Sequence, residues 1–373
     1  MKPSSSILLP AASVGPAVLV ALVTPPAPIR TANFTSLVTF GDSFTDSGNV
    51  FRLTNGQYPP PAPLTDNGRH SNGLMWPEYL AKFLHADLPQ GIPVHNFAYG
   101  GATSNDSLVQ GYSPAGTTGR DRARYLATPG VDQQLTMFKL HLEASANASH
   151  FVRPLFVIWA GTWDLLWDSA AGNATPDRIV GNLMTAVGHL DMLAKQNAGV
   201  MRNGYDIVLM GLPPMDRLPL LKRMPSAARM FEELALRTNR IMYDRLAKSN
   251  VGREVARLPR IQFVDVHALL HWVVDSPDTY NFGTPKTPGL TVQDPCLMTD
   301  IRSQEVRMCA EPAAHVFWGD AWFSTRAHRI LARAVAGVFG IYMEPLPKPG
   351  DDGKEKETES GSGGKRSEAV RPE

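Results

Sequence analysis

The segment "SLVTFGDSFTDSGNV" (residues 36–50) decides the fold that this sequence predicts. It begins as a mostly apolar run, and the run ends abruptly at Gly41, Asp42 and Ser43. A short apolar run that is bounded by Gly and small polar residues is typical of a buried strand followed by a turn. Ser43 is then either an ordinary turn residue or a nucleophile held at the carboxyl end of that strand.

The same order of apolar run, turn and helical segment recurs along the chain. We predict strands at residues 36–40, 94–97, 154–161, 205–211 and 261–266. Apolar residues at helical spacing predict helices at residues 76–84, 178–196, 227–247 and 326–339. Strands that alternate with helices form parallel βαβ units, so we expect one α/β domain with a parallel sheet of about five strands.

Both ends of the chain differ from this pattern. Residues 1–32 contain Lys2 and the apolar run "AVLVALV" (residues 17–23), followed by prolines. That order predicts a secretory leader that is too short to span a bilayer; the alternative is a disordered leader rich in Pro and Ser. Residues 345–373 are charged and nearly free of apolar side chains, which predicts a disordered tail. The domain then covers residues 33–344.

Two further features fit an extracellular protein. Four possible glycosylation sites have Ser or Thr two residues after the asparagine: Asn33, Asn105, Asn147 and Asn173. The two cysteines, Cys296 and Cys309, predict one disulfide in an oxidising compartment, with two free thiols as the alternative. No cluster of Cys and His completes a metal site around them, so we expect no bound metal.

Charge excludes some classes of partner. The chain has 36 basic and 35 acidic residues, a formal charge of +1, and no basic run with interleaved aromatic residues. Nucleic acid is therefore not an expected partner.

Three of the predicted turns lie at the carboxyl ends of parallel strands, where α/β proteins bind ligands. They contain Ser43, the pair Gly100 and Gly101, and the segment Thr162–Asp164. Backbone N–H groups in such turns can stabilise an oxyanion, and a glycine leaves room for a carbonyl to approach them. The alternative is that Ser43 caps a helix and that the glycines only form turns.

Three stretches resemble blocks of a known family. "FGDSFTDSGN" (residues 40–49) resembles the first block of the GDSL, or SGNH, serine hydrolases. "GRHSNGLMWPEYLA" (residues 68–81) and "NFAYGGATS" (residues 96–104) resemble later stretches of its secreted branch, which includes carbohydrate acetylesterases. The resemblance implies a flavodoxin-like three-layer α/β/α sandwich. It also implies that Ser43 is the nucleophile and that the N–H groups of Ser43 and Gly101 form the oxyanion hole.

Two blocks depart from the family pattern. In "AGTWDLL" (residues 160–166), Trp163 stands where the family's G-x-N-D has an oxyanion-hole Asn, and an indole N–H can donate one hydrogen bond. In "VFWGDAWFSTRAHRILA" (residues 316–332), Asp320 and His328 are the candidates for the D-x-x-H pair, but the position three after Asp320 is Phe323. One interpretation is that a single His is missing between Trp322 and Phe323. His328 is otherwise a packed or exposed helix residue.

The resemblance predicts a secreted, monomeric serine esterase that works through an acyl-serine intermediate without metal or organic cofactor. Its expected partner is a small ester or an acetylated glycan, with acetyl esters of polysaccharides ahead of short-chain lipid esters. A serine without a base is a poor nucleophile. The alternative is therefore a catalytically impaired relative that binds glycans or esters.

Overall fold

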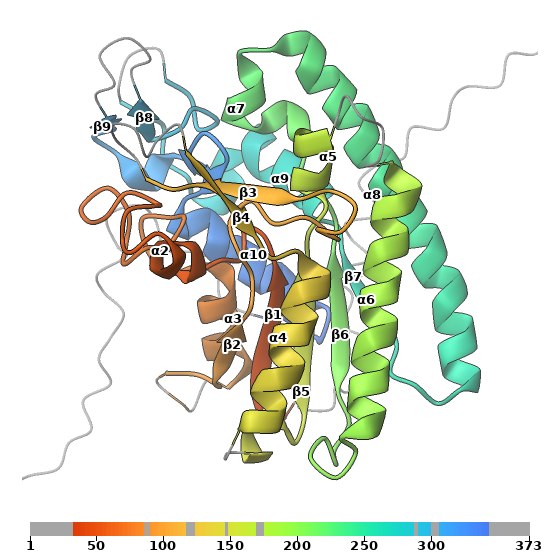
Figure 1. Cartoon of the computed structure of the whole chain (residues 1–373). Coiled ribbons are helices and arrows are strands. Elements are labelled where there is room, and N and C mark those ends of the chain that lie inside the picture. The colour runs from red at the N-terminus through yellow and green to blue at the C-terminus, as the bar shows by residue number, and fades with distance from the viewer. Residues whose placement is uncertain are drawn as a thin grey trace, which may run out of the picture.

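A computed structural model describes residues 33–342, except for 86, 87, 89, 117–123, 146, 147, 169–174, 287–289 and 300–305 (Figure 1). The expected leader (residues 1–32), the expected tail (residues 345–373), Asn147 and Asn173 lie outside these described residues.

A five-stranded parallel sheet forms the centre of the molecule. Its order is β2-β1-β5-β6-β7. The strands are β1 (Ser36–Gly41), β2 (Val94–Asn96), β5 (Pro154–Trp159), β6 (Asp206–Met210) and β7 (Ile261–Val264). Every residue of β1 and β5 is buried, as expected for central strands that are covered on both faces. All five strands lie where the sequence predicts them, with ends that differ by one or two residues.

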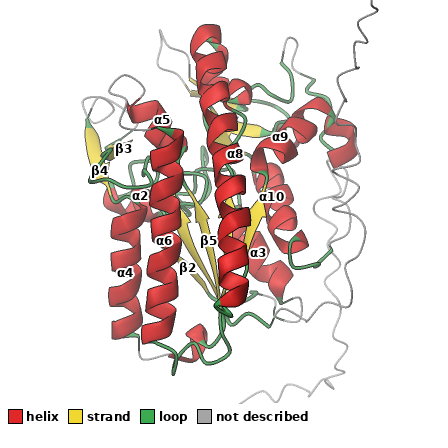
Figure 2. Ribbon diagram, turned by 90° about the vertical axis from the view of Figure 1, so that its right-hand side faces the viewer, coloured by secondary structure: helices red, strands yellow, loops and turns green. Residues whose placement is uncertain are grey.

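Helices cover the two faces of the sheet (Figures 1 and 2). On one face lie α4 (Val131–Ala144) and α6 (Pro176–Gln196), and on the other lie α3 (Trp76–Leu84) and α10 (Thr325–Gly337), which pack against each other. The long α8 (Pro225–Val255) packs on α6 and β7, and α9 (Val266–Asp275) follows β7. This layered arrangement with a flavodoxin-like strand order confirms the predicted fold class.

Shorter elements connect these strands and helices, most of them near the carboxyl edge of the sheet and one, η2, directly before the start of β5. They are the helices α2 (Asn49–Leu53), α5 (Thr162–Asp168) and α7 (Pro219–Lys222), the 3-10 helices η2 (Ala148–Phe151), η3 (Met215–Arg217), η4 (Pro277–Tyr280) and η5 (Pro312–Ala314), and three hairpins. The hairpins pair β3 (Gly111–Pro114) with β4 (Tyr125–Thr128), β8 (Leu297–Thr299) with β9 (Val306–Met308), and β10 (Phe317–Gly319) with β11 (Trp322–Phe323). Strands of two to four residues are too short to show an alternating pattern, so the sequence did not predict them.

The strand order determines where a site can form. From β1 the chain passes to β2 on one side and later crosses to β5 on the other side. In such a sheet the carboxyl ends of β1 and β5 border the crevice at which ligands bind. Ser43 follows β1 and α5 follows β5, so this crevice is the first place to look for a site.

Candidate active site

The turn that carries Ser43 is held from both sides of β1. Gly41 has a φ of +146°, and a Cβ there would lie 2.0 Å from the carbonyl oxygen of Trp159, so only glycine fits at this strand end. The amide of Gln134 on α4 accepts from Gly41 N–H at 2.8 Å and donates to its carbonyl at 2.9 Å. The turn is therefore anchored to both its neighbouring strand and the helix that covers it.

Asp46 joins this turn to the glycine-rich turn after β2. Its carboxylate accepts from the backbone N–H groups of Gly48, Asn49, Val50 and Gly100, at distances between 2.5 and 3.0 Å. Asp42 instead accepts from Phe44 N–H, and burial raises its pKa well above the ordinary value. Asp46 therefore fixes the position of the Gly100–Gly101 segment relative to Ser43.

Two backbone N–H groups at this edge have no acceptor. Neither Ser43 N–H nor Gly101 N–H donates a hydrogen bond to any residue that the structure describes. Gly101 has a φ of +81°, and a Cβ would lie 1.9 Å from the carbonyl oxygen of Tyr112. Both residues are buried, Ser43 to 3% exposure. Buried N–H groups usually have partners, so these two are suited to a substrate oxyanion.

The structure places Trp163 beside the serine. It lies in α5, and its Nε1–H donates to Ser43 Oγ at 3.2 Å. Its ring stacks on Trp167, with centroids 5.7 Å apart, and Trp167 Nε1–H donates to the Gly101 carbonyl at 3.2 Å. Sequence reasoning did not identify Trp167, although its spacing of four residues from Trp163 on a helix was a usable signal.

Asp164 holds α5 against the glycine turn. Ser104 donates to it twice, from its hydroxyl at 2.5 Å and from its backbone N–H at 2.8 Å. Burial raises the pKa of Asp164 to about 6. Asn182 on α6 donates to the same Ser104 hydroxyl at 2.9 Å. Asp164 therefore positions Trp163 and Trp167 and is more than a simple turn residue.

The structure does not join Asp320 and His328 into a hydrogen-bonded pair. Asp320 is exposed at the turn of the β10–β11 hairpin, where its carbonyl accepts from Leu220 N–H at 2.8 Å. His328 is 1% exposed on α10, neither of its ring nitrogens has a hydrogen-bond partner among the described residues, and its ring lies 5.9 Å from that of Phe323. Burial, with a smaller effect of His70, lowers the pKa of His328 to about 3.

The packing of the β10–β11 hairpin argues against a single missing residue between Trp322 and Phe323. Phe323 is fully buried between Phe44 and Trp159, with ring centroids 5.1 and 6.2 Å away. The next residue, Ser324, caps α10 by accepting from Ala327 N–H. An inserted residue would displace one or the other. Two substitutions describe the departure better, because Gly319 and Trp322 have the spacing of D-x-x-H and pair across the hairpin.

His70, in the loop of residues 54–73, lies beside this hairpin. It is 1% exposed, its Nδ1 is 3.4 Å from the carbonyl oxygen of Asp46, and its ring is 5.2 Å from that of Trp322. A Cβ on Gly100 would lie 2.8 Å from His70 Nε2. Burial lowers the pKa of His70, so the ring is predominantly neutral at pH 7. In the structure it makes no hydrogen bond to Ser43.

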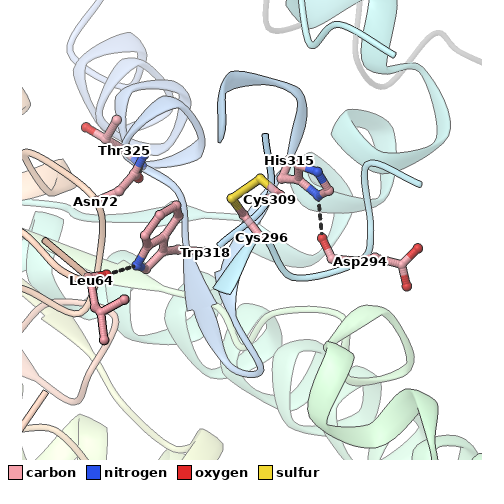
Figure 3. The surroundings of a disulfide bond; sticks show 8 residues. All are labelled: Leu64, Asn72, Asp294, Cys296, Cys309, His315, Trp318 and Thr325. Carbon is pink, nitrogen blue, oxygen red and sulfur yellow. Dashed lines mark hydrogen bonds between the residues drawn. A yellow bond between two sulfur atoms is a disulfide. The ribbon is translucent and has the colours of Figure 1, made fainter. Parts of the chain in front are cut away.

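The predicted disulfide is confirmed. Cys296 and Cys309 are bonded, with their Cα atoms 4.8 Å apart (Figure 3). Cys296 N–H donates to the Phe317 carbonyl at 3.1 Å, and Trp318 Nε1–H donates to the Leu64 carbonyl at 2.9 Å. The disulfide therefore closes the base of the β8–β9 hairpin, the hydrogen bond from Cys296 joins that hairpin to β10, and β10 in turn contacts the loop of residues 54–73, which carries His70.

The other predicted features are placed as follows. Asn33 is exposed, and Asn105 is half-buried, with its side chain accepting from Ser107 N–H at 3.0 Å. Among the described residues, no helix has both the length and the apolar character that crossing a bilayer requires.

Comparison with known families supplies the identity. The sequence model of the GDSL-like lipase/acylhydrolase family matches residues 37–335. The chain belongs to this family. A thermolabile hemolysin of Vibrio parahaemolyticus serotype O3:K6 is 23% identical over 300 residues, which cover 79% of this chain and 62% of the relative. An acetylesterase of Thermothelomyces thermophilus is 29% identical over 210 residues, which cover 53% of this chain and 61% of the relative.

This GDSL-family chain thus spans about three fifths of the length of those two relatives. Among solved structures, a lipolytic G-D-S-L protein from Veillonella parvula DSM 2008 has a TM-score of 0.41 and 12% identity, covering 82% of this chain and 97% of that one. Measured against the family blocks, this member retains the serine and glycine turns. It has Trp163 in place of the Asn, and Gly319 and Trp322 at the spacing of the D-x-x-H pair.

Proposed function

We propose that this GDSL-family chain hydrolyses carboxylic esters through an acyl-enzyme on Ser43, at a rate limited by the lack of a positioned base. One observation carries the proposal. Two backbone N–H groups without acceptors, those of Ser43 and Gly101, lie in the turns that Asp46 joins, and the Trp163 indole N–H contacts Ser43 Oγ. Together they form a site for an oxyanion beside a serine hydroxyl.

The chemistry follows from that arrangement. Ser43 Oγ adds to the ester carbonyl carbon and gives its proton to solvent water, which later returns a proton to the leaving alcohol, and the carbonyl oxygen becomes an oxyanion that accepts from the N–H groups of Ser43 and Gly101. The oxyanion collapses, the C–O bond to the alcohol breaks, and the alcohol leaves with a proton. A water molecule then adds to the acyl-serine in the same way and releases the acid. Trp163 keeps its hydrogen bond to Oγ or turns toward the oxyanion in place of the family's Asn.

The expected rate is low. The hydrogen bond of Ser43 Oγ comes from Trp163, and no described imidazole or carboxylate accepts a hydrogen bond from the hydroxyl. A positioned general base contributes roughly 10²–10⁴-fold to such reactions. An oxyanion hole and binding alone still leave about 10³–10⁴-fold catalysis over water.

Aromatic side chains beside the site support a polysaccharide ester as substrate. Trp167 contacts Tyr112 on β3 and Tyr125 on β4, with ring centroids 5.8 and 6.0 Å apart. All three rings are more than a third exposed. Their flat apolar faces are suited to the rings of a sugar, and the resemblance to acetylesterases favours acetyl groups. Short-chain lipid esters are the second class.

A second function is favoured by one specific observation. Gly319 and Trp322 stand at the spacing of the D-x-x-H pair, and the Trp322 ring packs on His70 and Tyr58. A protein that binds acetylated glycans without cleaving them would retain the aromatic surface and need no base. For either function, the disulfide supports the proposal that the chain is secreted, since such bonds persist in oxidising compartments.

Labelling with a fluorophosphonate probe tests the proposal. The probe phosphonylates a serine hydroxyl beside an oxyanion hole and releases fluoride and the hydroxyl proton, so the wild-type protein should be labelled slowly and Ser43→Ala should not be labelled. Ser226→Ala, at an exposed serine on α8, is the control and should be labelled normally. Labelling that survives Ser43→Ala would refute the assignment. Absence of wild-type labelling, together with retained binding to acetylxylan, would establish the binding function instead.

A further inference from the structure

Four side chains that are common metal ligands lie near one another beside β6 and β7, on the side of the sheet opposite to its other edge strand, β2. His267 and His271 lie one turn apart on α9, which starts just after β7. Glu232 comes from α8 and Asp216 from η3, which follows β6. Residues four apart on a helix share one face, so both imidazoles point to the same side of α9. The cluster therefore joins three segments at the carboxyl edge of β6 and β7.

The potential ligand atoms lie close together. Glu232 Oε1 is 2.5 Å from His267 Nε2 and 3.8 Å from His271 Nε2. Asp216 Oδ1 is 3.7 Å from His271 Nε2. Ligand atoms around a tetrahedral zinc ion, at bond lengths near 2.0–2.1 Å, are roughly 3.3 Å apart. Two of these separations are close to that value, and the pair of Glu232 and His267 would open by less than about 1 Å.

Neighbouring groups orient these ligands. Glu232 Oε2 accepts from Met215 N–H at 2.8 Å, which leaves Oε1 directed at the histidines. Asp216 Oδ1 has no hydrogen-bond partner among the described residues, although it is buried. Arg217 contacts the other oxygen, Oδ2, at 3.6 Å and pairs with Asp275 at 2.9 Å, so its positive charge lies beside the cluster and is partly balanced by these two carboxylates. Such outer contacts hold the first ligands of metal sites in place.

Access and burial also suit a metal ion. The exposed fractions of the side chains are 13% for His267, 15% for Glu232 and 27% for His271. The cluster is thus partly shielded from water but open to solvent at His271. His271 Nδ1 lies 3.9 Å from Asp275 Oδ2, too far for a hydrogen bond, and the other oxygen of Asp275 pairs with Arg217 at 2.9 Å; a nearby carboxylate of this kind favours the tautomer with the proton on Nδ1.

We propose that His267, His271 and Glu232, whose ligand atoms all lie within 4.8 Å of one another, bind one zinc ion, and that Asp216, which contacts only His271 Nε2 among them, becomes a fourth ligand by a movement of its side chain. Two imidazoles and carboxylates form a ligand set that prefers zinc to calcium or magnesium. The ion binds the Nε2 lone pairs, and the proton that His267 shares with Glu232 moves to Nδ1 or to solvent. Bound zinc cross-links η3, α8 and α9, two strands away from β1 and Ser43. It stabilises the fold there and takes no part in ester hydrolysis.

The sequence predicted no metal site because no cluster of Cys and His residues lies near the two cysteines. The ligands are spread over residues 216–271, and only His267 and His271 have a recognisable spacing. The folded α8 and η3 supply the carboxylates.

Titration of metal-free protein with zinc chloride tests the proposal, followed by calorimetry and thermal unfolding at pH 7. We expect one zinc per chain with a Kd below about 10 µM. Zinc at 100 times Kd should raise the melting temperature by about 4 °C or more. His271→Gln should weaken binding at least roughly 100-fold. Glu232→Gln should do the same, while its amide oxygen still accepts from Met215 N–H, so it carries the test if His271→Gln does not fold.

Two histidine variants are the controls. His189→Gln changes an exposed histidine on α6. His141→Gln changes a member of a second group of histidines, in which the His95 ring lies 5.1 Å from that of His141 and 6.0 Å from that of His150. Both should bind zinc as the wild type does. The proposal is overturned by absence of stoichiometric binding, by unchanged affinity in both cluster variants, or by loss of binding on His141→Gln.

Discussion

Replacing Gly319 by Asp and Trp322 by His restores a D-x-x-H pair that ends directly before Phe323, and we expect this double variant to hydrolyse esters faster than the wild type. The hairpin pairs the two positions across its strands. A Cβ on Gly319 would lie 2.9 Å from Cε3 of the Trp322 six-membered ring. The Asp therefore fits only when the smaller imidazole replaces the indole, so the two changes must be made together.

The magnitude follows from the role of a base. A positioned general base is worth roughly 10²–10⁴-fold, which corresponds to about 3–5 kcal/mol in the activation free energy. The loss of the half-buried indole, which packs on Tyr58 and His70, costs about 1–2 kcal/mol of folding free energy. Gly319→Asp alone should be more destabilising than the double variant because of the clash with Trp322.

The assay is hydrolysis of 4-nitrophenyl acetate between pH 5 and pH 9. The gain should grow with pH through the range near 6.5 in which an imidazole loses its proton. It should vanish when Ser43→Ala is added. The reasoning is refuted if a folded double variant, with near-UV circular dichroism like that of the wild type, shows no gain. It is also refuted if the gain survives Ser43→Ala.

Three further predictions concern stability. Cys296→Ser with Cys309→Ser should lower the free energy of unfolding by roughly 3 kcal/mol, because the bond closes a loop across 13 residues; an unchanged chemical denaturation midpoint would contradict this. Gly41→Ala should cost more than Gly204→Ala, since a Cβ at Gly41 meets the Trp159 carbonyl at 2.0 Å while Gly204 has nothing within 4 Å; equal melting temperatures would count against it. The pKa of His328 falls from 6.5 to about 3 on folding. Above pH 6.5 the ring is neutral in both states and the free energy of unfolding is unaffected. As the pH drops from 6.5 toward 3, only the unfolded chain binds a proton there, so the free energy of unfolding decreases. Denaturation at pH 6.5 and 4.5 should therefore show His328→Leu gaining about 2 kcal/mol relative to the wild type at the lower pH, and no relative gain would show that His328 is not buried in its neutral form.

The sequence by itself determined the sheet and the place of the serine. The strands β1, β5 and β6 are largely apolar runs that end at or just before a glycine, and these local signals do not depend on distant contacts. The strands β2 and β7 contain polar residues and were predicted from their place in the alternation of strands and helices. The helix α4 was missed, although Val131, Leu135, Phe138 and Leu142 recur at helical spacing. The order of strands and turns also predicted that Ser43 and Gly101 follow the carboxyl ends of β1 and β2, where the structure has them.

Only the tertiary structure decided how the remaining groups meet. That Trp163 donates to Ser43, that Trp167 donates to the Gly101 carbonyl and that His70 lies against Trp322 depend on where α5 and the long loop pack. The tertiary structure also decided how the chain departs from the D-x-x-H pair. Buried Phe323 and the Ser324 cap favour two substitutions, at Gly319 and Trp322, over one missing residue. Periodicity along one segment reports which face of that segment is buried. It carries no information on which other segment covers that face, because that depends on the packing of side chains from distant parts of the chain.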